Sequence, residues 1–331
     1  MSELRQDPVS GDWIILAPER AKRPHSLVEK KKPKRRPAPV SSCPFEPQNI
    51  VQPEIWPPIL SYPNEKNWKV VIIPNKYPAL RHFDGCATAI MHGPHSVKTG
   101  AGAHDLIVTR DHNKNFGELP FDEATRVLLI LQERYRHLAK DPCNLYTSTF
   151  FNWGPTAGAT VYHPHYQVLT LPIVPPDVAH SLHGSHRYFK QNGHCVHCNM
   201  LKFDLKEKSR IIDRNKYALS LTPFISRAPF EVRVFPLRHR SNFERTPSAE
   251  IKAVAAVLQS ALKRMKKHLN DPDFNFFIHT APLKDHKYRY YHWHVELIPQ
   301  IKILGGFELS TGVDINVVDP EKAASILKGR K

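Results

Sequence analysis

The sequence contains one ordered set of short motifs twice, and this repetition constrains the fold more than any other feature. The pattern His-x-x-Asn-Phe occurs at residues 112–116 and again at residues 239–243. A His-x-His pattern, followed two residues later by Gln or Glu, occurs at residues 163–167 and again at residues 292–296. The second copy follows the first by 127 to 129 residues, which indicates an internal duplication.

Each copy contains one amphipathic segment between its two histidine motifs. Apolar side chains recur at helical spacing over residues 121–138 and 247–269. A β-like stretch precedes each segment, and an Asp-Pro turn, an aromatic-rich stretch and the His-x-His stretch follow it. The repeated unit is therefore strand, helix, strand, strand. We expect an α+β fold in which helices pack against a mostly antiparallel sheet, with the halves at residues 1–175 and 176–331.

The composition is that of an ordinary folded protein with a basic surface. The 331 residues are 41% apolar and 24% charged, and no apolar run approaches the roughly 20 residues of a membrane span. Residues 1–12 lack the features of a signal peptide, so we expect a cytoplasmic protein with reduced thiols. The net charge is +16, and removing the six cations of residues 30–36 leaves +10, which favours an anionic partner. The run at 30–36 lies among prolines and is typical of a solvated loop, with a nucleic-acid patch as the alternative.

Cysteine and histidine spacing in the second copy predicts a zinc site. Cys195 and Cys198 form a Cys-x-x-Cys pair, and His239 and His292 would complete a tetrahedral set. A redox pair is the alternative, but we do not expect Cys195 to open a helix as in thioredoxin-like motifs. His239 follows Cys198 by 41 residues, which is too far for a DNA-reading zinc finger.

The first copy offers an analogous but weaker set of ligands. The candidate ligands are Cys43, Glu46, His112 and His163. Glu46 is a harder ligand than a thiolate, so this zinc site is expected to bind more weakly or to stay empty. Cys86 and Cys143 have no partner at ligand spacing, and we expect them to be free thiols. No organic cofactor is expected.

Alternation along a strand places His163, His165 and Gln167 on one face. If His163 binds metal, His165 lies about 7 Å further along and is free to react. The preceding turn, residues 152–160, contains two glycines and lets backbone N–H groups approach an anion closely. The second copy lacks such a turn, so only the first half is expected to be active.

These residue types suit phosphoryl chemistry. A neutral imidazole such as that of His165 can attack phosphorus and form a phosphoramidate, which divides one transfer into two displacements. Gln167 can donate a hydrogen bond to a non-bridging oxygen as charge shifts. Arg20 and Arg23 are the arginines whose surroundings in the sequence best suit a phosphate contact.

The chain resembles the galactose-1-phosphate uridylyltransferase family of the histidine-triad superfamily, including its ADP-glucose phosphorylase-like branch. The resemblance spans nearly the whole chain and rests on residues 7–13, 18–24, 43–45, 152–160, 163–167, 171–176, 195–198 and 305–308. It implies a duplicated histidine-triad-like fold, a homodimer, and His165 as the nucleophile that forms a nucleotidyl-histidine steadied by Gln167. It also matches Arg20, Arg23, Asn75, Asn152, Gly158 and Thr160 to nucleotide or phosphate contacts, and Lys302 and Glu308 to sugar-phosphate contacts made across the dimer.

Two departures from the family pattern affect the substrate and the metal. Glu46 replaces a cysteine at the first metal site, and Asp314 stands where hexose-reading members carry a glutamine. We expect nucleotidyl transfer, with a hexose-1-phosphate uridylyltransferase-like enzyme first and adenylyl transfer to phosphate, from ADP-glucose or adenylyl sulfate, as the runner-up. A basic zinc protein that binds nucleic acid without catalysis is the alternative of another class. The identity of the base and of the acceptor stays open.

Overall fold

The computed structural model describes residues 1–22, 37–50, 57–284 and 287–330. Its centre is one ten-stranded sheet in the order β10-β11-β12-β14-β13-β8-β9-β7-β4-β3, in which every neighbouring pair is antiparallel. The strands are β3 (Leu60–Tyr62), β4 (Val70–Pro74), β7 (Ala103–Thr109), β8 (Tyr146–Trp153), β9 (His165–Leu171), β10 (Ile211–Arg214), β11 (Ala218–Leu221), β12 (Val232–Pro236), β13 (Phe274–His279) and β14 (His294–Pro299). The expected α+β class with a mostly antiparallel sheet is confirmed.

The two halves contribute equivalent strands in the same order, counted from each edge of the sheet to its middle. In the first half β4, β7, β9 and β8 are neighbours, and in the second half β11, β12, β14 and β13 occupy the matching places. The two halves join where β8 pairs with β13, so a single sheet runs through both. The duplication inferred from the histidine motifs is therefore visible in the topology.

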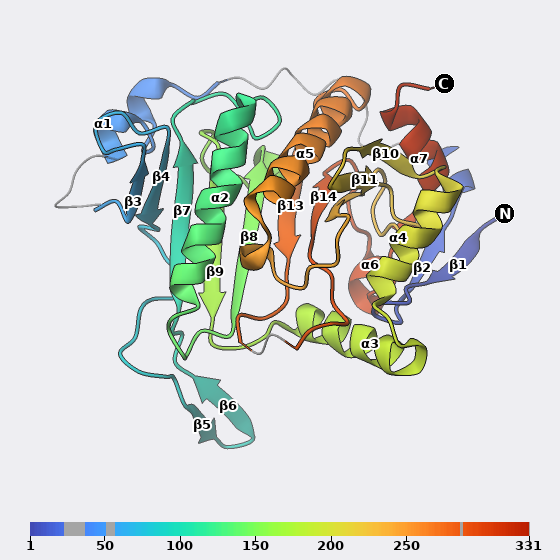
Figure 1. Ribbon diagram of the computed structural model, residues 1–331, viewed down its shortest axis with the longest axis horizontal. Helices are drawn as coiled ribbons and strands as arrows, with labels where there is room; N and C mark the ends of the chain where they lie inside the picture. Colours follow the sequence, from blue (N-terminus) through green and yellow to red (C-terminus); the bar gives the residue numbers. More distant parts are fainter. Residues whose placement is uncertain (23–36, 51–56, 285–286, 331) are drawn as a thin grey trace.

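Two long helices cover one face of the sheet and build the main core. They are α2 (Phe121–Leu138) and α5 (Ser248–His268), which lie side by side across the sheet (Figure 1). The first coincides with the predicted segment 121–138, and the second lies within the predicted segment 247–269. Their buried faces pack on one another and on alternate strand residues such as Ile107, Tyr166 and Phe276.

The opposite face of the first half carries a smaller apolar cluster. Phe45 and Ile50 pack there against Trp68 and against the strand residues Ile73 and Val108. Phe45 follows the short 3-10 helix η2 (Val40–Ser42), and Ile50 ends the single turn α1 (Pro47–Ile50). Because successive strand residues point to opposite faces, this cluster and the α2 side of the sheet are separated.

Further helices surround the second half and were not anticipated from the sequence. They are α3 (Pro176–Asn192), α4 (Val196–Glu207), α6 (Gly306–Thr311) and α7 (Pro320–Leu327). A small sheet of β1 (Glu3–Gln6), β2 (Trp13–Leu16) and β15 (Ile315–Asn316) lies beside them. Among the described residues, no helix is both long enough and apolar enough to cross a membrane.

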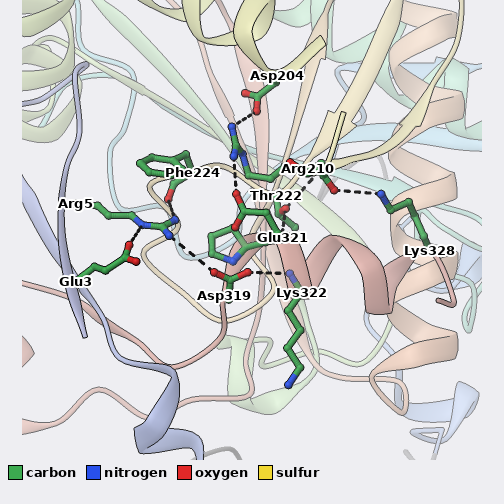
Figure 2. A network of polar contacts seen from close by, with 12 residues as sticks. Glu3, Arg5, Asp204, Arg210, Thr222, Phe224, Asp319, Glu321, Lys322 and Lys328 are labelled. Atoms are coloured by element: carbon green, nitrogen blue, oxygen red, sulfur yellow. Dashed lines mark hydrogen bonds and ion pairs between the residues drawn. The ribbon is translucent and has the colours of Figure 1, made fainter. Parts of the chain in front are cut away.

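A network of polar contacts around the buried Arg5 and Arg210 attaches the N-terminal strand and the last helix to the second half (Figure 2). Arg210 lies between Asp204 of α4 and Glu321 of α7, forming ion pairs with both. Arg5 of β1 donates to the carbonyl of Phe224 at 3.0 Å and stacks 4.0 Å above its ring centre. These contacts join segments from both ends of the chain.

Cys86 and Cys143 form a disulfide, so the expectation of two free thiols is wrong. Spacing in the sequence could not reveal the pair, because the fold brings together two segments 57 residues apart. Cys143 lies in the turn that follows α2, and Cys86 precedes the hairpin of β5 (Ala89–His92) and β6 (His95–Lys98). The hairpin projects from the body of the molecule (Figure 1).

Candidate active site

His165 is the first residue of β9 and is 7% exposed. Its Nδ1 is 2.9 Å from the carbonyl oxygen of His163, so Nδ1–H donates and Nε2 retains its lone pair. Burial lowers the pKa of His165 below its usual 6.5, and the bond to His163 opposes this effect only in part. The Phe45 ring packs 5.0 Å from the imidazole. The result is an oriented imidazole that favours the neutral form and whose Nε2 has no hydrogen-bond partner among the described residues.

Gln167 lies on the same face of β9 and is held by a residue that the sequence did not single out. Nδ1 of His104, on β7, accepts a hydrogen bond from the backbone N–H of Ala79. The ring proton is therefore on Nε2, which donates to Oε1 of Gln167 at 3.0 Å. With Oε1 engaged, the Gln167 amide group can donate into the site. The two residues lie on neighbouring strands but 63 positions apart, so no local motif could connect them.

The predicted anion-binding turn follows β8 directly. Residues 155–157 form the 3-10 turn η3 (Pro155–Ala157), flanked by Gly154 at φ 89° and Gly158 at φ 84°. Such angles are left-handed and favour glycine. A side chain at Gly154 would also lie 2.2 Å from the Asp273 carboxylate.

The remaining predicted nucleotide contacts are distributed around this turn and beyond. Asn152 is the penultimate residue of β8, and Thr160 is exposed after the turn. Asn75 follows β4, with its side-chain amide 3.2 Å from Nε2 of His104. Arg20 is exposed on the 3-10 helix η1 (Pro18–Lys22) after β2, so the structure places it with the small sheet. Arg23 lies outside the described residues, as does the basic run 30–36.

The four predicted ligands of the first metal site meet in a buried cluster. Cys43, Glu46, His112 and His163 bring their ligand atoms within 4.8 Å of one another. Nε2–H of His112 donates to the carbonyl of Ala38, and that of His163 donates to the carbonyl of Thr109. Both Nδ1 atoms therefore face the cluster, the arrangement in which a second hydrogen bond orients a metal-binding histidine. Burial also lowers the pKa of His163, which keeps it in the neutral form that binds metal.

The second predicted site is assembled with three ligands together and the fourth adjacent. Cys195, Cys198 and His239 have ligand atoms within 4.8 Å of one another, and Nδ1 of His292 is 3.6 Å from Sγ of Cys198. Hydrogen bonds from Cys198 and His239 lower the pKa of Cys195 to about 5. The expectation that Cys195 opens no helix is wrong, because it is the N-cap of α4. The two histidines beside the pair nevertheless distinguish it from a two-cysteine redox motif.

The second half repeats the backbone contact of His165 at His294. Nδ1 of His294 lies 3.1 Å from the carbonyl of His292, as in the His165 pair. Glu296 replaces glutamine and forms ion pairs with Arg233 at 3.6 Å and His279 at 3.1 Å. His279, His294 and Glu296 form a third group of metal-ligand type, which was not predicted from the sequence. The sequence feature that could have indicated this group is the glutamate at position 296, which corresponds to Gln167 in the first half.

The predicted sugar-phosphate residues lie next to the small sheet. Nζ of Lys302 is 2.6 Å from Oε1 of Glu308, and the pKa of Glu308 is lowered by this contact. Asp314 is half-buried beside them, and burial raises its pKa although Arg227 and Lys302 oppose the effect. Within the described part of the chain, neither Lys302 nor Glu308 forms a hydrogen bond or ion pair with His165.

Two family models match the sequence. One, described as "Galactose-1-phosphate uridyl transferase, N-terminal domain", matches residues 1–175, more than half of the chain and including His165 and Gln167. The chain belongs to the galactose-1-phosphate uridylyltransferase family. The other model, "Domain of unknown function (DUF4921)", matches residues 92–328.

Relatives in the galactose-1-phosphate uridylyltransferase family align over almost the entire chain. ADP-glucose phosphorylase from Arabidopsis thaliana is 34% identical over 98% of this chain and 92% of its own length. Galactose-1-phosphate uridylyltransferase from Thermotoga maritima is 26% identical over 99% of this chain and 98% of its own. A crystal structure of the Arabidopsis ADP-glucose phosphorylase with bound ADP-glucose covers 100% of both chains with a TM-score of 0.84 at 31% identity. The chain is therefore an enzyme of the nucleotidyltransferase class.

Proposed function

We propose that this enzyme moves a nucleoside monophosphate from a nucleotide donor to an anionic acceptor through a covalent nucleotidyl-His165. The observation that carries the proposal is the fixed tautomer of His165. Its Nδ1–H is committed to His163, and its pKa is lowered by burial, so Nε2 is an unprotonated nucleophile near neutral pH.

The reaction divides into two displacements at phosphorus. In the first, the Nε2 lone pair attacks the α-phosphorus, an N–P bond forms, and the bond from phosphorus to the leaving phosphate oxygen breaks. In the second, an acceptor oxygen attacks the same phosphorus and the N–P bond breaks. Gln167 donates to a non-bridging oxygen in both steps, and the glycine turn supplies backbone N–H groups.

Zinc is the metal that the two predicted ligand sets suit. Cys195, Cys198, His239 and His292 match a tetrahedral structural site, and Cys43, Glu46, His112 and His163 match a weaker one with a carboxylate. Bound zinc would cross-link the loops that hold these residues. In the first site it would fix His163, whose carbonyl orients His165.

The proposed enzyme is a cytoplasmic homodimer whose first half, residues 1–175, carries the nucleophile. The second half, residues 176–331, carries the second zinc site and the contacts to the acceptor. Arg20, Arg23, Asn75, Asn152, Gly158 and Thr160 are the proposed nucleotide or phosphate contacts. Lys302 and Glu308 lie with the small sheet, which suits contacts made to the site of a second copy.

Two donors fit this chemistry. UDP-hexose with a hexose 1-phosphate acceptor matches the family name, and ADP-glucose with a phosphate acceptor matches the relative at 34% identity. The second donor is favoured by Asp314, because a carboxylate repels a hexose 1-phosphate where hexose-reading members carry a glutamine.

The test is to incubate the protein with ADP-glucose, UDP-glucose or adenylyl sulfate labelled at the α-phosphate and to measure label retained on the protein. We expect one of the three donors to label the wild-type protein. His165→Gly should reduce labelling and turnover by several orders of magnitude, a loss similar to that caused by removing the nucleophile of a catalytic triad. Labelled donor should also exchange with its own leaving group when the acceptor is absent. Wild-type turnover by a folded His165→Gly protein would refute the mechanism.

The matched control is His294→Asn in the second half. His294 has the same backbone contact but no glycine turn beside it, so labelling per folded molecule should stay near the wild-type level. Circular dichroism of both variants separates a loss of chemistry from a loss of fold.

A further inference from the structure

The strand β13 of the second half contacts the catalytic edge of the first half through one pair of amides. In the β8–β13 register, Asn152 and Asn275 are direct partners. Nδ2 of Asn275 donates to Oδ1 of Asn152 at 2.8 Å. This is a side-chain bond between the two halves at the end of the strand that leads into the glycine turn.

Hydrogen bonds to both the oxygen and the NH₂ group of the Asn275 side chain fix its orientation. Its Oδ1 accepts from Nε2 of Gln300 at 2.6 Å, and its Nδ2 also donates to the carbonyl of Ala157 at 2.8 Å. Reversing the Asn275 amide would place its oxygen against two acceptors and its NH₂ group against another NH₂ group. Three hydrogen bonds therefore select one orientation.

That orientation determines what Asn152 presents to the site. Because Oδ1 of Asn152 accepts from Asn275, its Nδ2 points the other way, 3.8 Å from the place that a Cβ on Gly158 would occupy. Among the described residues, none accepts a hydrogen bond from this Nδ2. Asn152 directly follows Phe151, and Phe151 pairs with Tyr166, the residue that follows His165. The Asn152 donor is thus held at the end of β8 that leads into the glycine turn.

A second residue of the same half fixes the turn itself. Oδ2 of Asp273 accepts from the backbone N–H of Thr156 at 2.9 Å and from its hydroxyl at 2.5 Å. Asp273 is 4% exposed and closes the space beside Gly154. The second half thereby supports both the turn and the amide that precedes it.

We infer that Asn275 is a positioning residue, which orients the Asn152 amide as a donor to the nucleotide during transfer through His165. The inference rests on the proposed function, since it assigns a role within that same site. The half without a nucleophile thus takes part in the reaction through its strand β13.

The test is Asn275→Asp, which is nearly isosteric but cannot donate. The Asn152 amide then turns to donate its Nδ2 to the new carboxylate, and its oxygen faces the nucleotide. We expect single-turnover nucleotidylation of His165 to slow by about tenfold or more, the scale of losing one oriented donor. On an Asn152→Ala background the same substitution should have no further effect, because the amide that it turns is gone.

A purely structural role predicts additive losses in this cycle, and additivity would overturn the inference. Asn215→Asp is the matched control: Nδ2 of Asn215 also donates to a backbone carbonyl, that of Ala253, away from the site. It should lower the melting temperature without changing the nucleotidylation rate. If Asn275→Asp does not fold, Gln300→Glu replaces it in the double-mutant cycle. A glutamate at position 300 can only accept a hydrogen bond, so the Asn275 amide must reverse to donate to it.

Failure of the two proposals can be told apart. Absence of label on His165 in wild type would refute the covalent mechanism. Normal labelling in wild type with an unchanged rate in folded Asn275→Asp would refute the positioning role alone.

Discussion

His165 has to be neutral to act as a nucleophile, and its surroundings favour that form. Burial destabilises the imidazolium ion, whereas the bond from Nδ1–H to His163 favours it less strongly. The net effect lowers the pKa below 6.5. The imidazole of His165 therefore favours the unprotonated form that the proposed nucleophile requires.

This lowered pKa predicts the pH dependence of the first half-reaction. Because the inactive form is the cation, the rate of His165 nucleotidylation should be constant through neutral pH and fall only below the usual histidine pKa of 6.5. The measurement is single-turnover labelling between about pH 5 and pH 8. An acid limb centred above 6.5 would show that a partner stabilises the cation, contrary to the geometry described.

The sequence predicted the site residues whose chemistry is visible within a short motif. His165 and Gln167 could be inferred because a strand period of two places them on one face. His104 and Asn275 could not, because each acts through pairing between strands far apart in the chain. The Cys86–Cys143 disulfide was missed for the same reason.

At the scale of elements, the first metal cluster ties the segment between η2 and α1 to the residues that follow β7 and to those that precede β9. Its weak member is Glu46, whose carboxylate lies 2.6 Å from Nδ1 of His112. If zinc is bound as proposed, a chelator should remove the ion at Glu46 before the ion at Cys195 and Cys198. Glu46→Cys should then slow that release. The rate of zinc release to a chromogenic chelator tests this prediction. Two ions that leave the wild-type protein equally slowly would contradict it.

The Arg210 network connects α4, β10 and α7, and it makes a stability prediction. Arg210→Met leaves the buried carboxylate of Asp204 without its cation, and should lower the free energy of unfolding by about 3 to 5 kcal/mol. Urea unfolding measures the loss. The double variant Arg210→Met with Asp204→Leu should regain part of it, because no buried charge remains. Equal losses in the single and double variants would contradict this explanation.

The two long helices were predictable because each buries one stripe of apolar residues at a period of 3.6. The helices α3 and α4 were not, because their burial depends on partners elsewhere in the fold. Gly184 of α3 shows why: a Cβ there would lie 1.8 Å from the carbonyl oxygen of Val9. The helix can pack against that backbone only because the residue is glycine, and the sequence alone does not show which surface comes so close.

At the scale of the whole molecule, the two halves have diverged around one shared sheet. In the first half, Gln167 is paired with His104. In the second, the carboxylate of Glu296, at the position of Gln167, forms ion pairs with Arg233 and His279. The second half retains the strand geometry, and through β13 it supports the turn of the first.

The proposed homodimer divides the site between copies, with Lys302 and Glu308, which form their ion pair next to the small sheet, serving the site of the other copy. A site built from two chains can be restored by mixing two inactive proteins. His165→Gly retains Lys302, and Lys302→Ala retains His165, so a mixed dimer contains one complete site and one site that lacks both residues.

We therefore expect the two variants, each nearly inactive alone, to recover activity when they are denatured together and refolded as a mixture. With random pairing of equal amounts, half of the dimers are mixed and half of their sites are complete, so activity should reach about one quarter of wild type. Mixing either variant with a His165→Gly, Lys302→Ala double variant is the control, and should restore nothing. If recovery is absent while native mass spectrometry shows mixed dimers, Lys302 serves the site of its own chain, and the proposed exchange between copies is wrong.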